Sequence, residues 1–236
     1  MLIYGIHACK NAVESERKVY KAYLLNGKRM PEWMKQYRVE IVDDFSGMLP
    51  KDAVHQGIAL EIDDIQYFDI NMLKTSPKNC TVAILDGVTD PHNMGAIIRS
   101  AACFGITAII ISDKSSCKIT GTVAKSASGG LEHLPVILVT NLSQAIAKLK
   151  TFGFWIVSLS ERGEKRIDEI DLTGKTCLVL GAEGAGIRRL QIKNSDFLAK
   201  LPTLPMFPTL NVSNSAAIAF YETAKQNDFN LTGSSK

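Results

Sequence analysis

The stretch CLVLGAEGAG, from Cys177 to Gly186, decides how we interpret the fold of this chain. An apolar run leads into a cluster of glycines, and this pattern is typical of a buried strand that ends in a loop. Glycine lets the backbone approach a ligand closely because it has no Cβ atom. The pattern therefore favours a ligand-binding loop at the end of the strand.

Two interpretations of the glycine cluster remain open. The glycines could simply form a tight turn between a strand and a helix. Glu183 favours a ligand site instead, because a turn alone gains nothing from a carboxylate. A second loop, between Leu201 and Asn211, contains three prolines that would stiffen it, and a strongly helical run follows at Ala216–Tyr221. We therefore expect a site built from both loops.

A third segment completes a family pattern. Residues Asp86–Ala101, DGVTDPHNMGAIIRSA, resemble the first of three motifs of the SpoU (TrmH-type) RNA ribose 2′-O-methyltransferases, and the two loops resemble the other two. All three motifs occur in the order typical of that family. The resemblance covers the larger, C-terminal part of the chain.

Strands and helices alternate along residues 80–230. We expect strands at 81–86, 108–111, 136–139, 155–158 and around Cys177, and helices at 94–104, 123–128 and 143–152, the last with Ser143 as its N-cap. Continuous apolar strands indicate a parallel sheet that is covered on both faces. The alternation predicts a doubly wound, Rossmann-like α/β domain with its ligand at the carboxyl ends of the strands.

Residues 1–62 predict a small mixed α/β domain. We expect helices at 8–16 and 32–37 and strands at 18–25, 39–42 and 58–62. The motifs Gly5–Ala8 and His55–Ile58 are similar to the substrate-binding domain of many SpoU proteins, whose fold is like that of an RNA-binding ribosomal protein. A linker is expected at 63–79 and a disordered tail at 231–236.

The positive charge of the chain is concentrated near its N-terminus. The formal net charge is +3, and residues 1–40 contain eight basic and four acidic side chains, against 19 basic and 20 acidic ones in the remainder. This distribution suits either a solvated surface or a surface that follows RNA phosphates.

Cysteine and histidine spacing argues against disulfides and metals. The five cysteines are odd in number and form no C-x-x-C pair, so a disulfide framework is not expected. The four histidines lack the spacing of metal ligands, so we predict no metal site. Neither a membrane-spanning apolar run nor a signal-peptide core is evident, so we expect a cytoplasmic protein.

The resemblance carries further implications for fold, cofactor and assembly. In SpoU proteins the C-terminal part of the chain forms a deep trefoil knot, and the knotted segment binds S-adenosylmethionine. Gly181, Leu201 and Leu210 would contact this cofactor, largely through main-chain atoms, although their pattern alone would assign both leucines to the core. Family members are homodimers with sites at the subunit interface, so the resemblance also implies a homodimer.

The resemblance also implies a set of catalytic residues, namely Arg99, Asn93, Glu183, Asn211 and Thr209. Asn93 could instead be a helix N-cap. Glu183 would orient Asn93 or the loop backbone, and Thr209 takes a place where serine is common in the family. Arg99 would activate the ribose hydroxyl, either as a base or as a phosphate clamp. Since a guanidinium holds its proton firmly, we favour the clamp.

The function that the resemblance implies is S-adenosylmethionine-dependent methylation of a ribose 2′-hydroxyl, on a guanosine of 23S (large-subunit) rRNA. The N-terminal domain favours rRNA, and tRNA is the alternative substrate. An inactive RNA-binding relative is a further alternative, which the retained polar motif residues disfavour. A nucleotide-dependent oxidoreductase is disfavoured because the glycine cluster lacks G-x-G-x-x-G spacing.

Overall fold

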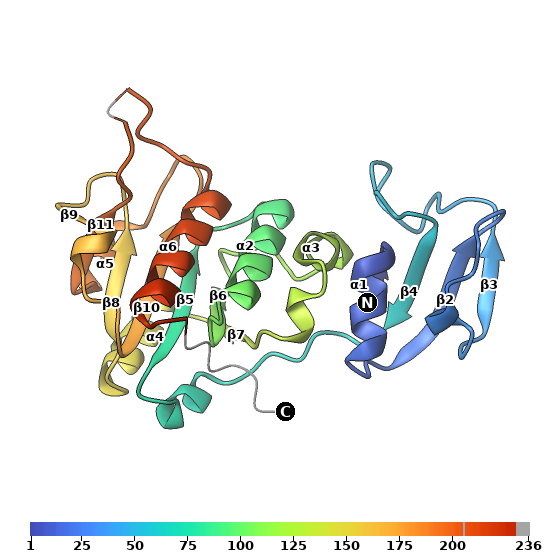
Figure 1. The fold of residues 1–236 in the computed structure, drawn as a ribbon, viewed down its shortest axis with the longest axis horizontal. Helices are drawn as coiled ribbons and strands as arrows, with labels where there is room; N and C mark the ends of the chain where they lie inside the picture. Colours follow the sequence, from blue (N-terminus) through green and yellow to red (C-terminus); the bar gives the residue numbers. More distant parts are fainter. Residues whose placement is uncertain (205, 230–236) are drawn as a thin grey trace.

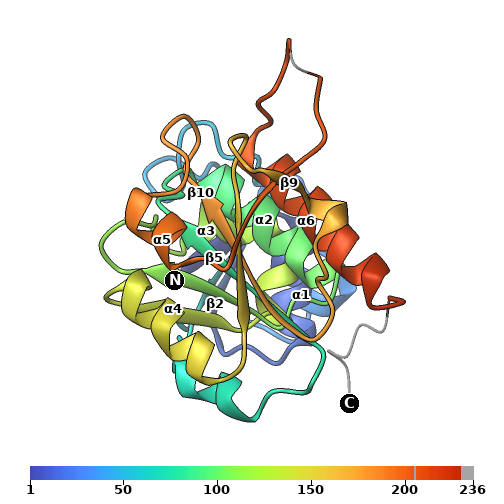
Figure 2. The ribbon, with the colours of Figure 1, turned by 90° about the vertical axis from the view of Figure 1, so that its left-hand side faces the viewer.

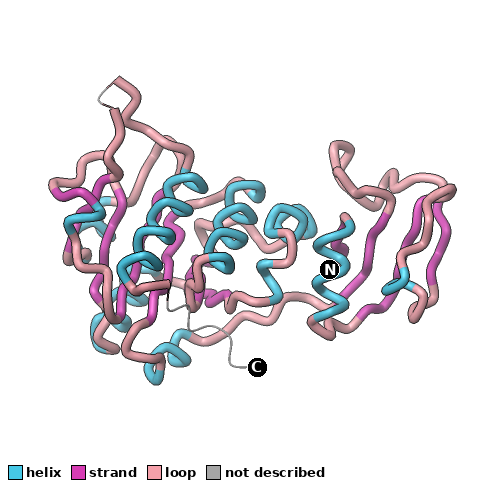
Figure 3. Tube along the Cα trace, viewed as in Figure 1, coloured by secondary structure: helices cyan, strands magenta, loops and turns pink. Residues whose placement is uncertain are grey.

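The structure is a computed structural model that describes residues 1–204 and 206–229. It contains a four-stranded sheet with strand order β1-β4-β2-β3 and a seven-stranded sheet with order β7-β6-β5-β10-β8-β11-β9. The two sheets lie at opposite ends of an elongated molecule (Figure 1), and Figure 3 shows the helices and loops between them. The tail predicted to be disordered, 231–236, lies outside the described residues.

The small sheet is built from the N-terminal part of the chain. Its elements are β1 (Leu2–Tyr4), α1 (Ile6–Glu14), β2 (Val19–Leu25), the 3-10 helix η1 (Glu32–Met34), β3 (Val39–Val42) and β4 (Ile58–Ile62). β4 pairs antiparallel with β1 and β2, while β3 pairs with β2 in parallel. The small α/β unit is therefore confirmed, whereas its predicted boundary at residue 62 stays a prediction.

Two helices of this unit differ from the sequence-based expectation. The first begins at Ile6 rather than residue 8, because Gly5, with φ +88°, caps it. The second, expected at 32–37, is only the single turn η1. A segment this short cannot offset the cost of helix nucleation.

The rest of the chain forms the large sheet and its covering helices. The elements are η2 (Ile70–Thr75), β5 (Cys80–Asp86), α2 (Pro91–Cys103), β6 (Ala108–Ser112), α3 (Gly121–Ala127), η3 (Gly130–Glu132), β7 (Val136–Val139), α4 (Leu142–Thr151), β8 (Trp155–Leu159), β9 (Lys165–Arg166), η4 (Ile167–Glu169), β10 (Lys175–Gly181), α5 (Arg189–Asn194), β11 (Phe197–Lys200) and α6 (Val212–Gln226). Neighbouring strands pair in parallel. The predicted parallel α/β sheet is confirmed.

Helices cover both faces of the large sheet. In β5, Ala83 and Leu85 join the core under α2 and α6, whereas Val82 and Ile84 join the core under α4. Figure 2 shows α4 and α5 on one side of the sheet and α2 and α6 on the other. This alternation explains why β5 is buried along its whole length and apolar from Val82 to Leu85.

Two details of the large domain were not expected. The N-cap of α4 is Asn141, not Ser143, because the Asn141 carboxamide oxygen accepts from the amides of Ser143 (2.9 Å) and Gln144 (3.2 Å). The short elements α5, β9 and β11 were not assigned from the sequence.

Strand order places β10 between β5 and β8, but order alone does not test how the chain threads, so the knot stays a prediction.

The five cysteines are free thiols. Cys9, Cys80 and Cys177 are buried. Burial raises the pKa of the Cys9 thiol to about 12, so this thiol stays protonated and unreactive.

The segment predicted as a linker, 63–79, is partly structured. It contains η2, and Phe68 forms a parallel bridge with Ile137 of β7, with its amide donating to the carbonyl of Val136 at 2.9 Å. The linker thus runs along the outer edge of the large sheet.

An arginine ties the small unit to the large one. Arg17 donates from Nε to Asp63 Oδ1 (2.8 Å) and from Nη1 to Glu132 Oε2 (3.2 Å). The side chain of Glu132 is only 8% exposed, so this contact is shielded from water. A hydrogen bond between Tyr4 and Thr122 (3.0 Å) joins β1 to α3 nearby.

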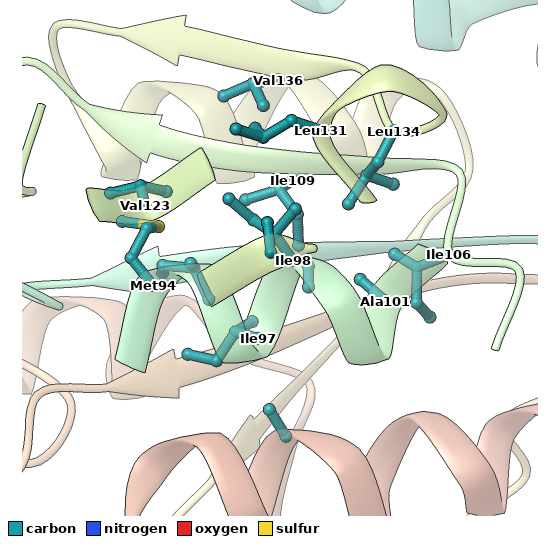
Figure 4. Packing of buried hydrophobic residues seen from close by; sticks show 14 of the residues in the cluster. Met94, Ile97, Ile98, Ala101, Ile106, Ile109, Val123, Leu131, Leu134 and Val136 are labelled. Atoms are coloured by element: carbon teal, nitrogen blue, oxygen red, sulfur yellow. The ribbon is translucent and has the colours of Figure 1, made fainter. Parts of the chain in front are cut away.

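Helices α2 and α3 cross at Gly95. A Cβ atom there would lie 2.4 Å from the Cβ of Ser126 and 2.6 Å from the carbonyl oxygen of Val123. The absence of a side chain thus allows α3 to pack against the helix that carries the first motif. Figure 4 shows the apolar layer around this helix, including Met94 and Ile98.

We predict that Gly95→Ala destabilises the protein by about 1–3 kcal/mol because it overpacks this crossing. Helix propensity alone would predict the opposite, since alanine is favoured over glycine by about 1 kcal/mol. Urea unfolding measures the difference, with Ser100→Ala on the same helix as a control that should change stability by less than about 0.5 kcal/mol. A Gly95→Ala variant as stable as the wild type would contradict the close crossing.

Candidate functional site

The glycine cluster forms a tight loop at the end of β10. The amide of Ala182 donates to the carbonyl of Gly186 (3.1 Å), and the amide of Gly186 donates back to the carbonyl of Ala182 (2.9 Å). A Cβ atom at Gly181 would lie 2.2 Å from the carbonyl carbon of Gly186. The turn thus requires glycine at position 181, which does not decide between the turn and the ligand-site interpretations, and Glu183 is exposed on this loop.

Glu183 meets two asparagines from distant parts of the chain. Asn93 Nδ2 donates to Glu183 Oε2 at 3.1 Å, and Asn211 Nδ2 lies 3.0 Å from Asn93 Oδ1 and 3.4 Å from Glu183 Oε2. We call Asn93, Glu183 and Asn211 the polar triangle. Each residue comes from a different motif, so the structure brings the three motifs together.

The two asparagines are oriented by their own backbone surroundings. Asn211 caps α6, and its Oδ1 accepts from the Ser213 amide (2.8 Å) and hydroxyl (2.6 Å), which turns its Nδ2 toward the triangle. The N-cap of α2 is Asp90, which accepts from the amides of His92 and Asn93. The N-cap interpretation of Asn93 is therefore wrong, and its side chain is free to form the hydrogen bonds of the polar triangle.

A buried carboxylate anchors the far end of the glycine loop. Asp86, 1% exposed at the end of β5, accepts from the Arg188 amide (2.9 Å) and from Arg188 Nε (2.6 Å). Arg188 also donates to the Ser115 hydroxyl at 3.3 Å. Sequence reasoning placed Asp86 at a ligand-binding strand end but missed this pair. A carboxylate directly after the apolar run Val82–Leu85 was the available signal.

A cavity of about 450 Å³ lies between the glycine loop and the proline-rich loop. This volume is within the range of about 300–1,000 Å³ that is usual for small-molecule sites. The predicted cofactor residues Gly181, Leu201 and Leu210 all line it, as do Glu183, Asn211 and Thr209. Open space surrounds the Cα atoms of Gly184 and Gly186, where a Cβ would meet no atom within 4 Å.

Arg99 stands apart from this cavity. It is exposed on α2 and is not among the lining residues. Because an α-helix has about 3.6 residues per turn, the six positions between Asn93 and Arg99 direct their side chains to different sides of α2. Thr209 lines the cavity but takes no part in the polar triangle among the described contacts.

Residues 81–221, more than half of the chain, match the SpoU rRNA Methylase family. The chain belongs to this SpoU family. Residues 2–68 of this SpoU protein match a second family, described as RNA 2′-O ribose methyltransferase substrate binding. The two matches agree with the resemblance of both parts of the sequence.

Curated relatives of this SpoU protein match it over nearly their full length. The 23S rRNA (guanosine-2′-O-)-methyltransferase RlmB of Pseudomonas aeruginosa is 34% identical over 237 residues, which cover 95% of this chain and 96% of the relative. The protein of the same name from Coxiella burnetii is 36% identical and covers 96% of each chain.

A solved structure shares the fold of this SpoU protein. The SpoU methyltransferase AviRb from Streptomyces viridochromogenes, in complex with the cofactor AdoMet, superposes with a TM-score of 0.83. The two chains are 20% identical, and the match covers 97% of this chain and 90% of the other. The fold class is thereby confirmed across both sheets.

Two features are absent from the described part of the chain. Residues 1–204 and 206–229 contain no helix long and apolar enough to cross a membrane. The same residues contain no group of three or more His, Cys, Asp or Glu side chains arranged to hold a metal ion.

We predict that Asp86→Asn loosens the glycine loop, because the amide side chain cannot serve Arg188 as an ion-pair partner. Hydrogen–deuterium exchange at the amides of Gly186 and Arg188 should become faster, by about tenfold for a loss of about 1.4 kcal/mol of local stability. Asp113→Asn, at an exposed carboxylate directly after β6, is the matched control. Equal exchange in both variants would show that the pair does not hold the loop.

Proposed function

We propose that this chain transfers a methyl group from S-adenosylmethionine to a ribose 2′-hydroxyl, on a guanosine of 23S rRNA. The polar triangle beside the loop-lined cavity is the observation that carries the proposal. Family membership supports the reaction class, and the names of the full-length relatives support the substrate. A cytoplasmic location is part of the proposal, since ribosomal RNA is found there.

The cavity fits S-adenosylmethionine in size and lining. Gly181, Leu201 and Leu210 would hold it, with the two leucines as apolar walls and the glycine loop as a surface free of side chains. When bound, this cofactor supplies an electrophilic methyl group on a positively charged sulfur. The remaining tasks, which are positioning the ribose and easing loss of its hydroxyl proton, belong to the chain itself.

The polar triangle is suited to positioning a hydroxyl. An asparagine Nδ2 carries two hydrogens, and the contacts among the described residues use one of them on Asn93, toward Glu183. The second remains available for the substrate ribose. Glu183 fixes both amides by accepting from each, so we assign it an orienting role rather than an acid–base role.

Arg99 supports a homodimer as part of the proposal. Its side chain is exposed outside the cavity of its own chain, so a second copy would have to bring it to the reaction. The exposed apolar residues suit such a partner. Ile218 and Tyr221 on α6 are 43% and 48% exposed, and Met206 and Phe207 on the proline-rich loop are 78% and 74% exposed.

The reaction is tested with labelled S-adenosylmethionine and separately purified, unmodified large-subunit rRNA and tRNA. We expect label on rRNA and a fall in kcat of about 100-fold or more in Arg99→Ala, because a charged group that stabilises the transition state is lost. Arg99→Lys should also be impaired, since it keeps the charge but loses the two-pronged guanidinium.

Each other outcome has a defined meaning. Unchanged turnover in Arg99→Lys would reject the phosphate clamp. Label on tRNA alone would keep the chemistry and replace the substrate. Absence of label on both RNAs, despite cofactor binding, would favour an RNA-binding protein without activity.

Sharing of the site between subunits has its own test. Arg99→Ala and Glu183→Ala should each be inactive alone, and mixing them after subunit exchange should restore about a quarter of wild-type activity, because half of the dimers are mixed and each has one intact site. A mixture as inactive as its components would contradict a shared site.

A further inference from the structure

Lys125 on α3 lies at the junction between the small and the large sheet. Its Nζ donates to Gln56 Oε1 at 2.8 Å, and the same oxygen accepts from the amide of Ile6 at 3.1 Å. Gly5 leaves room for the lysine, since a Cβ atom there would lie 2.4 Å from Nζ and 2.7 Å from Cδ. Residues of the motifs Gly5–Ala8 and His55–Ile58 thus fix the position of this ammonium group.

The ammonium group of Lys125 is held without an opposite charge. Among the ion pairs of the described residues, none includes Lys125. An ammonium has three N–H donors, and Gln56 takes one with a neutral oxygen. Partial burial lowers the pKa of Lys125, because the charged form loses hydration there. A cation that is fixed, partly dehydrated and uncompensated favours an anionic ligand.

The position of Lys125 connects the small sheet to the polar triangle. The next residue, Ser126, has its hydroxyl 3.3 Å from His92 Nδ1, and His92 directly precedes Asn93. In Figure 1 the start of α1, the start of α2 and the loops that line the cavity all lie along the upper edge of the molecule. A chain laid along this edge would pass Lys125 before it reached the cavity.

We propose that Lys125, fixed by Gln56, binds a phosphate of the substrate RNA backbone and positions the strand between the small sheet and the cavity. The ligand is a phosphodiester, because a lysine recognises phosphate as a point charge. This proposal rests on the proposed function for the identity of the RNA. Lys125 acts as a positioning residue, and the chemistry stays with the polar triangle and Arg99.

The test uses two variants of the full chain and an unmodified large-subunit rRNA transcript. Lys125→Met removes the charge and keeps an apolar stem over Gly5. Gln56→Glu keeps an oxygen that accepts from Lys125 and Ile6, but its negative charge compensates the positive charge of the ammonium group. RNA affinity is measured by fluorescence anisotropy at several salt concentrations, and KM and kcat are measured by methyl transfer.

We expect both variants to raise KM for the RNA by about tenfold, the equivalent of one charged hydrogen bond, while kcat stays near the wild-type value. The slope of log affinity against log salt should fall by about 0.7–0.9, as expected for one lost phosphate contact. Lys74→Met on η2 and Gln144→Glu on α4 make the same charge changes away from the junction and should alter neither quantity.

A purely structural role for Lys125 gives a different result. In that case Lys125→Met would lower the melting temperature, Gln56→Glu would bind RNA like the wild type, and the salt slope would not change, which would overturn the proposal. If the wild type transferred no methyl group to rRNA, the proposed function would fail instead. The salt slopes of Lys125→Met and Lys74→Met would still decide the role of Lys125.

Discussion

The ion pair between Asp86 and Arg188 is the constraint on which the site depends. A carboxylate at the buried end of β5 needs a partner, and it finds one at the point where the glycine loop returns to the sheet. The loop is thereby fixed at both ends, by β10 and by this pair. Glu183, at its exposed tip, can then meet Asn93 and Asn211 in one arrangement.

Most of the fold could be predicted because strands that are buried on both faces of a sheet appear in the sequence as continuous apolar runs. The apolar run of β5 is an example, since helices cover both of its faces. The short elements have no such pattern in the sequence. α5 has six residues and β11 has four, so their positions follow from tertiary packing rather than local pattern. The N-cap of α4 was misplaced because Asn141 and Ser143 are both favourable caps.

Residues of the candidate site could be named from the sequence only where they belonged to a motif. Asn93, Glu183 and Asn211 were expected from the family resemblance, yet their mutual hydrogen bonds required three distant segments to meet. The link from Asp86 to Arg188 spans 102 positions, and no local spacing indicates such a pair. Arg99 marks a further limit, since it lies outside the cavity of its own chain and the role we propose for it requires a second copy of the chain.

The bridge between Phe68 and Ile137 has a consequence for how the protein avoids self-association. β7 is the last strand of the large sheet, and an open edge strand offers unpaired backbone groups to other chains. The connecting segment occupies part of that edge. At the opposite edge, β9 is two residues long and consists of Lys165 and Arg166, and a short edge strand with charged side chains disfavours pairing with a further strand. Both edges of the large sheet are thus less open to aggregation. At the β7 edge the protection comes from residues 63–79, which are also needed to connect the two parts of the chain.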